Sequence, residues 1–190
     1  MKKKYSLRDS SFSRMLKLKK YESLYDISSL EVRFAILVAF IFLLLFPLVS
    51  NYGEKIIVLQ KLVDFYDSIG MAMIGFLGVI IAGLAISIAL ISNKVFNYIK
   101  ENNHLNAIES LLYGFYLLGF ITAVQIMVMV ILHVVSMMDI TMTRTIFLVD
   151  EIIGVILVYL FTFSMFYTVK LIGVGLQLFE ILNEMENKLH

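Results

Sequence analysis

The run Ser68–Ser92, SIGMAMIGFLGVIIAGLAISIALIS, contains no charged residue and constrains the chain more than any other feature. It is long enough to cross a bilayer as one helix, which takes about 20 apolar residues. Three other runs are also long and mainly apolar. Together the four runs hold most of the hydrophobic residues, which make up 60% of the chain. Charged residues are 16% of the chain, against about 25% in soluble domains. The sequence therefore predicts an integral membrane protein.

The apolar runs predict an all-α, polytopic fold with four transmembrane helices. We expect the spans at about residues 31–50, 68–92, 110–137 and 150–172, within a transmembrane domain of residues 31–176. A basic segment, residues 1–30, precedes this domain, and a helical tail, residues 177–190, follows it. Ser28 and Glu31 have the spacing of a capping box, which predicts the start of the first span. Apolar residues at helical spacing within 51–67 predict a separate short helix between the first two spans.

The distribution of lysine and arginine predicts the topology. Thirteen of the 16 lie within residues 1–33, in the 92–110 loop, or from Lys170 to the end of the chain. Since cytoplasmic loops carry the excess of basic residues, both termini are expected in the cytoplasm and the protein in the cell (inner) membrane. The basic stretch before the first span fits a helix on the inner leaflet or a solvated tail that only sets the topology. The expected inner basic surface comprises Lys17, Lys19, Lys20, Lys94, Lys100 and Lys170.

Small residues recur along one face of the second predicted span. Helices in lipid associate where small residues let their backbones approach. This face is therefore expected to pack on another helix, either within the subunit or between subunits, whereas Ile80 and Ile81 are expected on other faces. The predicted packing seam comprises Gly75, Gly78, Ala82, Ala85, Ala89 and Ser92.

Motifs for catalysis, nucleotide binding and metal binding are missing from the sequence. The chain has no cysteine, and its histidines, His104, His133 and His190, are too far apart along the predicted topology to converge. No charged residue lies near the centre of a predicted span, where transporters and pumps usually carry their proton and ion sites. We therefore expect no enzyme activity, no cofactor and no metal.

Mildly polar residues remain within the predicted spans. Thr122, Gln125, His133 and Thr162 are the candidates, with Tyr159, Ser164 and Thr168 nearby in the same spans. Such groups either form hydrogen bonds between helices or line a narrow wet path, which needs no charged ring at its centre. Asp150 and Glu151 are candidates for one mouth of such a path.

The stretch GFLGVIIAGLAISIALISNKVFNYIKENNH, followed closely by another span, resembles small four-span bacterial membrane proteins of anti-phage defence systems. The membrane subunit of the Kiwa system and the channel-type effector of the Hailong system are of this type. The resemblance covers about residues 68–135 and assigns no functional residue. It implies a homo-oligomer, such as a tetramer, with a cytoplasmic protein partner or a nucleotide-type signal at the inner face.

These features favour an oligomeric, non-enzymatic membrane protein that forms or gates a pore or senses membrane disturbance. As part of a defence system, it would work with a cytoplasmic partner. Two alternatives stay open: a small passive transporter, and a membrane scaffold that recruits a soluble protein through the tail.

Overall fold

The computed structural model describes residues 20–52, 55–90, 105–136 and 144–189. These residues form a short 3-10 helix and four long α-helices, and no strand occurs among them. The all-helical expectation is thus confirmed. The elements are η1 (Lys20–Leu24), α2 (Leu30–Tyr52), α3 (Lys55–Leu90), α5 (Leu105–Ser136) and α6 (Arg144–Leu189).

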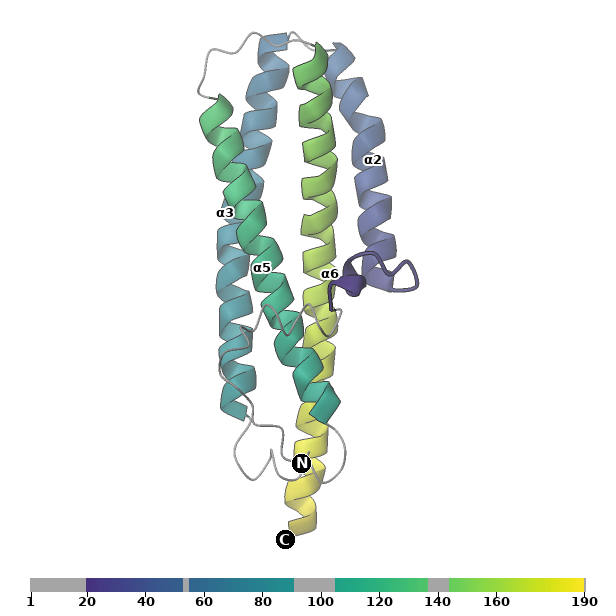
Figure 1. The fold of residues 1–190 in the computed structure, drawn as a ribbon, viewed down its shortest axis with the longest axis vertical. Coiled ribbons are helices and arrows are strands. Elements are labelled where there is room, and N and C mark those ends of the chain that lie inside the picture. The colour runs from purple at the N-terminus through teal and green to yellow at the C-terminus, as the bar shows by residue number, and fades with distance from the viewer. Residues whose placement is uncertain (1–19, 53–54, 91–104, 137–143, 190) are drawn as a thin grey trace, which may run out of the picture.

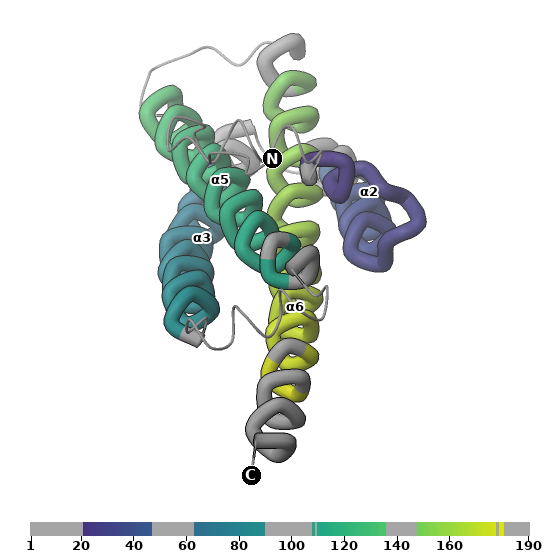
Figure 2. The backbone as a smooth tube through the Cα atoms, turned by 60° about the horizontal axis from the view of Figure 1, so that its bottom comes forward, coloured from purple at the N-terminus to yellow at the C-terminus, as the bar shows by residue number. Residues whose placement is uncertain are grey.

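The four long helices form an elongated bundle, in which α6 lies between α2 and α5 (Figures 1 and 2). Helix α2 packs mainly on α6, and α3 packs mainly on α5. Helix α6 is the longest, and its last turns extend beyond the ends of the other helices (Figure 1). We name the two ends of the bundle after residues of α6: the Asp150 end, near the start of α6, and the Lys170 end, where α2 begins.

Three of the helices contain stretches that are long and apolar enough to cross a membrane: Val63–Ala89, Ser110–Val135 and Leu148–Gln177. Their outer faces expose large apolar side chains, as expected for surfaces that contact lipid. Met71 is 75% exposed, Met127 65% and Val169 65%. The helices are thus those of a membrane protein.

The main core lies where α2, α3, α5 and α6 meet. Phe163 of α6 and Leu118 of α5 are fully buried there, and Val32 and Ala35 bring the start of α2 against them. Tyr159, Phe163 and Tyr167 stack on one another along α6, at four-residue steps that place them on one face.

Glycines outside the predicted seam make the close helix contacts within the subunit. A Cβ on Gly83 would lie 2.8 Å from the Phe115 ring, and one on Gly114 would lie 2.5 Å from the Leu171 side chain. At Gly75 and Gly78 a Cβ would meet nothing within 4 Å, and Ala82, Ala85 and Ala89 are exposed.

The predicted seam is therefore not a packing surface within the subunit, and its last member, Ser92, lies outside the described residues. Ile80 lies on another face than the seam, is only 2% exposed and packs near Gly119 of α5. The sequence pattern located a face of small residues correctly, but the face that meets α5 is the one carrying Ile80 and Gly83.

Two local expectations differ from the structure. The predicted capping box does not form, because Ser28 donates to Asp26 and Glu31 pairs with Lys170. The short helix expected within residues 51–67 is not separate, since α3 continues from Lys55 to Leu90.

Candidate functional site

Three side-chain oxygens in the bundle interior have no hydrogen-bond partner among the described residues. They are Thr122 Oγ1 and Gln125 Oε1 on α5 and Ser164 Oγ on α6, and all three residues are 0% exposed. The Gln125 amide is oriented by its nitrogen, which donates to the carbonyl of Leu157 at 3.3 Å and so leaves the oxygen free. A buried polar atom without a partner costs free energy, so three in one region require an explanation.

Two of the three oxygens, those of Gln125 and Ser164, lie toward the contact between α5 and α6. Gln125 meets α6 at Leu157, and Gly114 meets it at Leu171. Ser164 lies midway between these two α6 residues and therefore faces α5 near Gly119. Thr122 lies between that level and Gln125 along α5, but it is seven residues from both Phe115 and Met129, which meet Gly83 and Gly70 of α3, so it is on the face toward α3. We call Gln125, Thr122 and Ser164 together the oxygen row, which spans about 9 Å along the helices at 1.5 Å per residue.

Three other hydroxyl groups in α3 and α6 are satisfied by the backbone of their own helix. Ser68, Ser87 and Thr168 each donate to the carbonyl four residues earlier, at 2.7 to 2.8 Å. This bond is the usual arrangement for serine and threonine within a membrane helix. Thr122 and Ser164 do not make it, so their hydroxyls remain available to a ligand or to water.

Polar side chains from three helices pair at the Asp150 end. His133 Nδ1 of α5 lies 2.8 Å from Asp67 Oδ1 of α3, and Tyr66 Oη of α3 donates to Asp150 Oδ1 of α6 at 3.1 Å. Each pair joins two helices, so this end of the bundle is fixed by polar contacts between α3, α5 and α6.

An ion pair closes the other end. Lys170 of α6 contacts Glu31 of α2 and also lies 5.7 Å from the centre of the Tyr167 ring. The Glu31 side chain is only 8% exposed, whereas that of Lys170 is 51% exposed. Twenty residues separate Asp150 from Lys170 along α6, a rise of about 30 Å, which matches the hydrocarbon thickness of a bilayer. The oxygen row lies near the middle of this interval.

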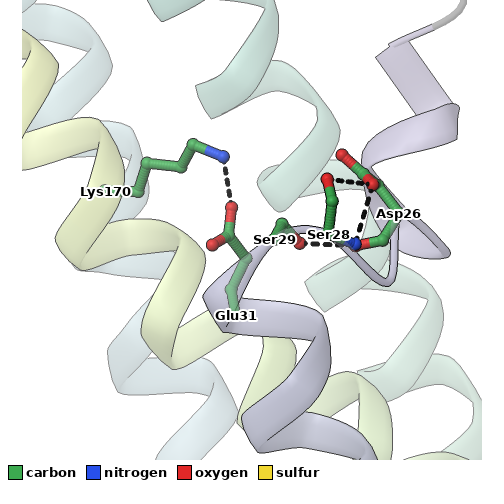
Figure 3. A network of polar contacts seen from close by, with 5 residues as sticks. All are labelled: Asp26, Ser28, Ser29, Glu31 and Lys170. Carbon is green, nitrogen blue, oxygen red and sulfur yellow. Dashed lines mark hydrogen bonds and ion pairs between the residues drawn. The ribbon is translucent and has the colours of Figure 1, made fainter.

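A compact turn precedes α2 at the Lys170 end (Figure 3). Asp26 Oδ1 accepts hydrogen bonds from the Ser28 backbone nitrogen at 3.0 Å and from its hydroxyl at 2.6 Å. These bonds lower the pKa of the exposed Asp26 carboxyl, the hydroxyl contributing most. Ser29 Oγ donates to the Asp26 carbonyl, and Arg33 Nε donates to the Ile27 carbonyl. The carboxylate therefore stays charged and holds the turn in shape.

The structure brings together some of the sequence-predicted residues and separates others. Thr122 and Gln125 belong to the oxygen row, and Thr162, 9% exposed, lies near it in the chain. His133 lies at the Asp150 end, in a helix-joining pair. Of the predicted basic surface, Lys170 is paired and Lys20 begins η1, whereas Lys17, Lys19, Lys94 and Lys100 lie outside the described residues.

Sequence reasoning missed the partners of these groups. The sequence pattern assigns Glu31 to a cap rather than to Lys170, and it assigns Tyr66 and Asp67 to the short helix expected within residues 51–67. A signal for the Glu31 pair did exist: each charge lies at the edge of an apolar run, at the same expected membrane boundary. Ser164 carried no signal beyond its polarity, because the pattern could not show that its hydroxyl is unpaired.

Among the described residues, no cluster of three or more histidine or acidic side chains could hold a metal ion. Comparison of the chain with protein families, with curated proteins and with solved structures finds no match.

Proposed function

We propose that this chain is a subunit of an oligomeric, non-enzymatic membrane protein that opens a path for ions across the bilayer. The observation that carries the proposal is the oxygen row. Apolar side chains of the same shape would fill these three positions without leaving buried oxygens unpaired. In the proposed mechanism the protein has a closed and an open conformation. The unpaired oxygens cost free energy in the closed conformation and are hydrated in the open one. The described conformation is then the closed one.

The proposed topology has four spans, with α2 as the fourth span beside the three long apolar stretches. Its sequence from Phe34 to Phe46 contains no charged residue. The excess of lysine and arginine before α2 and after α6 favours both termini in the cytoplasm. The Lys170 end is then the inner end, and the Asp150 end faces the outside of the cell membrane.

The exposed small-residue face of α3 is the proposed contact between subunits. Gly75, Gly78, Ala82 and Ala85 leave an open, shallow stripe on the subunit surface, and such stripes let helices approach closely in lipid. A tetramer is the assembly that the resemblance to defence proteins favours.

Replacing Gly78 by leucine should dissociate the oligomer and leave the subunit folded, because a side chain at this position meets nothing within the subunit. Ile81→Leu is the matched control, since Ile81 is 60% exposed on the same helix. Cross-linking in native membranes measures the assembly. Equal cross-linking of both variants would show that this face contacts lipid only.

Thr122→Val should reduce ion flux through liposomes containing the protein and should not lower its thermal stability. Valine has the shape of threonine but removes the unpaired oxygen. Thr168→Val is the control, because Thr168 is also buried but its hydroxyl is bonded to the Ser164 carbonyl. A purified protein that never passes ions, or one in which both variants have the same flux, would contradict the proposed path.

A second function is favoured by the part of α6 that continues past Lys170. Phe179, which follows the apolar stretch that ends at Gln177, is exposed (57%), as are the apolar residues of helices that dock into a groove of another protein. The chain would then act as a scaffold for a cytoplasmic partner in anti-phage defence. Deleting residues 177–190 should release such a partner and preserve the oligomer; loss of the oligomer would instead assign this stretch to self-assembly.

A further inference from the structure

The turn that precedes α2 lies beside the membrane helices and not beyond their ends. In Figure 1 the start of α2 lies well short of the lower ends of α3, α5 and α6. Glu31 pairs with Lys170, seven residues before the apolar stretch of α6 ends. Tyr159 lies 11 residues, about 16 Å, closer to the Asp150 end, and its hydroxyl donates to the carbonyl of Leu24. The turn therefore runs alongside the apolar surface of α6.

Three backbone carbonyls of this turn find their donors within the protein. The Leu24 carbonyl accepts from the Tyr159 hydroxyl, and the Ile27 carbonyl accepts from Arg33 Nε at 2.8 Å. The Asp26 carbonyl accepts from the backbone nitrogen three residues later at 2.9 Å. In a solvated turn, water would satisfy such carbonyls, whereas lipid offers no donor. These bonds are the ones that a non-helical segment needs where it contacts lipid.

Several side chains that this turn and η1 expose are large and apolar or aromatic. Ile27 is 67% and Leu30 66% exposed, and Tyr21 and Tyr25 are exposed with their ring centres 6.4 Å apart. Turns in water mostly carry glycine, proline and small polar residues, whereas tyrosine is enriched at the boundary between membrane and water. We name Tyr21, Tyr25, Ile27 and Leu30 the interfacial patch.

The interfacial patch is continuous with the exposed face of α2. Leu30, Phe34 and Leu37 follow one another at steps of four and three, so they lie on one face of the helix. All three are exposed. This face contacts lipid if α2 crosses the bilayer, and Leu30 belongs both to it and to the patch. The lipid-facing surface of α2 therefore extends into the turn without interruption.

We propose that the interfacial patch is a contact surface for phospholipids of the inner leaflet. Their acyl chains cover Ile27 and Leu30, and the two tyrosines lie at the boundary with the headgroups. The exposed Asp26 carboxylate interacts electrostatically with Lys170, so it lies near the inner boundary that this lysine marks, among the headgroups. Contact with the membrane then begins before residue 31, where the sequence predicts the first span. This inference rests on the proposed topology, because the patch meets the inner leaflet only if α2 crosses the bilayer.

Quenching of a single tryptophan tests which molecules cover the patch. The chain has no tryptophan, so Ile27→Trp and Leu30→Trp each introduce the only one, at a position with space for it. The full-length variants are placed in liposomes of phospholipids brominated either close to the headgroup or near the chain end, because bromine quenches an indole that it contacts. Acrylamide in the buffer measures access from water. Leu37→Trp is the control on the exposed face of α2, and Glu180→Trp is the aqueous control, beyond the apolar stretch of α6.

Ile27→Trp and Leu30→Trp are expected to lose more fluorescence to bromines close to the headgroup than to bromines near the chain end. Leu37→Trp should show the opposite order, because it lies seven residues, about 10 Å, deeper along α2 than Leu30. Glu180→Trp should be quenched by acrylamide and by neither lipid.

Three results would overturn the lipid contact. If the lipids quench Leu37→Trp while acrylamide alone quenches both patch variants, α2 spans the bilayer but the patch lies in water. If neither quencher reaches the patch variants, protein covers the patch instead of lipid. If acrylamide alone quenches Leu37→Trp as well, the proposed four-span topology fails, and the lipid contact fails with it.

Discussion

Lys170→Met is expected to lower the free energy of unfolding by about 2 kcal/mol. The substitution leaves the Glu31 carboxylate, whose side chain is 8% exposed, without its cationic partner. Removing one partner of a fully buried pair costs about 3–5 kcal/mol. The effect here is smaller because the Lys170 side chain is 51% exposed, so solvent already screens part of the attraction. Unfolding of the protein in detergent micelles measures the change.

The double variant Glu31→Gln/Lys170→Met is the control for this prediction. It removes both charges, and replacing an ion pair by uncharged groups is often close to neutral. Its stability should therefore lie above that of Lys170→Met alone. If the single and double variants were equally unstable, the loss would come from the contact of the Lys170 ammonium group with the Tyr167 ring rather than from the unpaired Glu31 carboxylate.

Gly114→Leu is expected to destabilise the subunit by about 3 kcal/mol, at the upper end of the range for overpacked cores. Even a Cβ at this position would lie 2.5 Å from one methyl carbon of Leu171 and 3.2 Å from the other. Leu171 is itself only 3% exposed, so its side chain has little free space into which to move. Helices α5 and α6 must then separate at the Lys170 end of their contact.

Gly78→Leu provides the comparison for Gly114→Leu, because it adds the same side chain to a glycine with nothing within 4 Å. In detergent that separates subunits, Gly78→Leu should unfold like the wild type, and Gly114→Leu should unfold earlier. The same loss of stability in both variants would show that leucine at Gly78 also meets a neighbour within the subunit.

The helical architecture follows from the sequence because its signal is long and local. Four apolar runs, each bounded by charges or by polar residues, are enough to predict an all-α membrane protein. Part of the candidate site could be predicted for the same reason. Thr122 and Gln125 are polar residues among apolar neighbours, and their spacing of three places them near each other on the helix surface.

The contacts between helices could not be read in this way. The spacing of Gly78 and Ala82 identifies a face of small residues, but periodicity within one helix does not say whether a second helix lies behind it. The structure places α5 instead against the face with Ile80 and Gly83. The contact from Tyr159 to Leu24 joins residues 135 positions apart, and nothing in the local pattern near Leu24 points to it.

The continuous α6 helix also has a mechanical consequence. From the Lys170–Glu31 pair to Leu189 its backbone runs for 19 more residues without interruption, a projecting arm of about 28 Å. An unbroken helix transmits a tilt along its whole length, so a rotation of about 10° at the ion pair displaces the tip of this arm by about 5 Å. A small tilt of α6 at the ion pair would therefore produce a larger movement at the end of this helix.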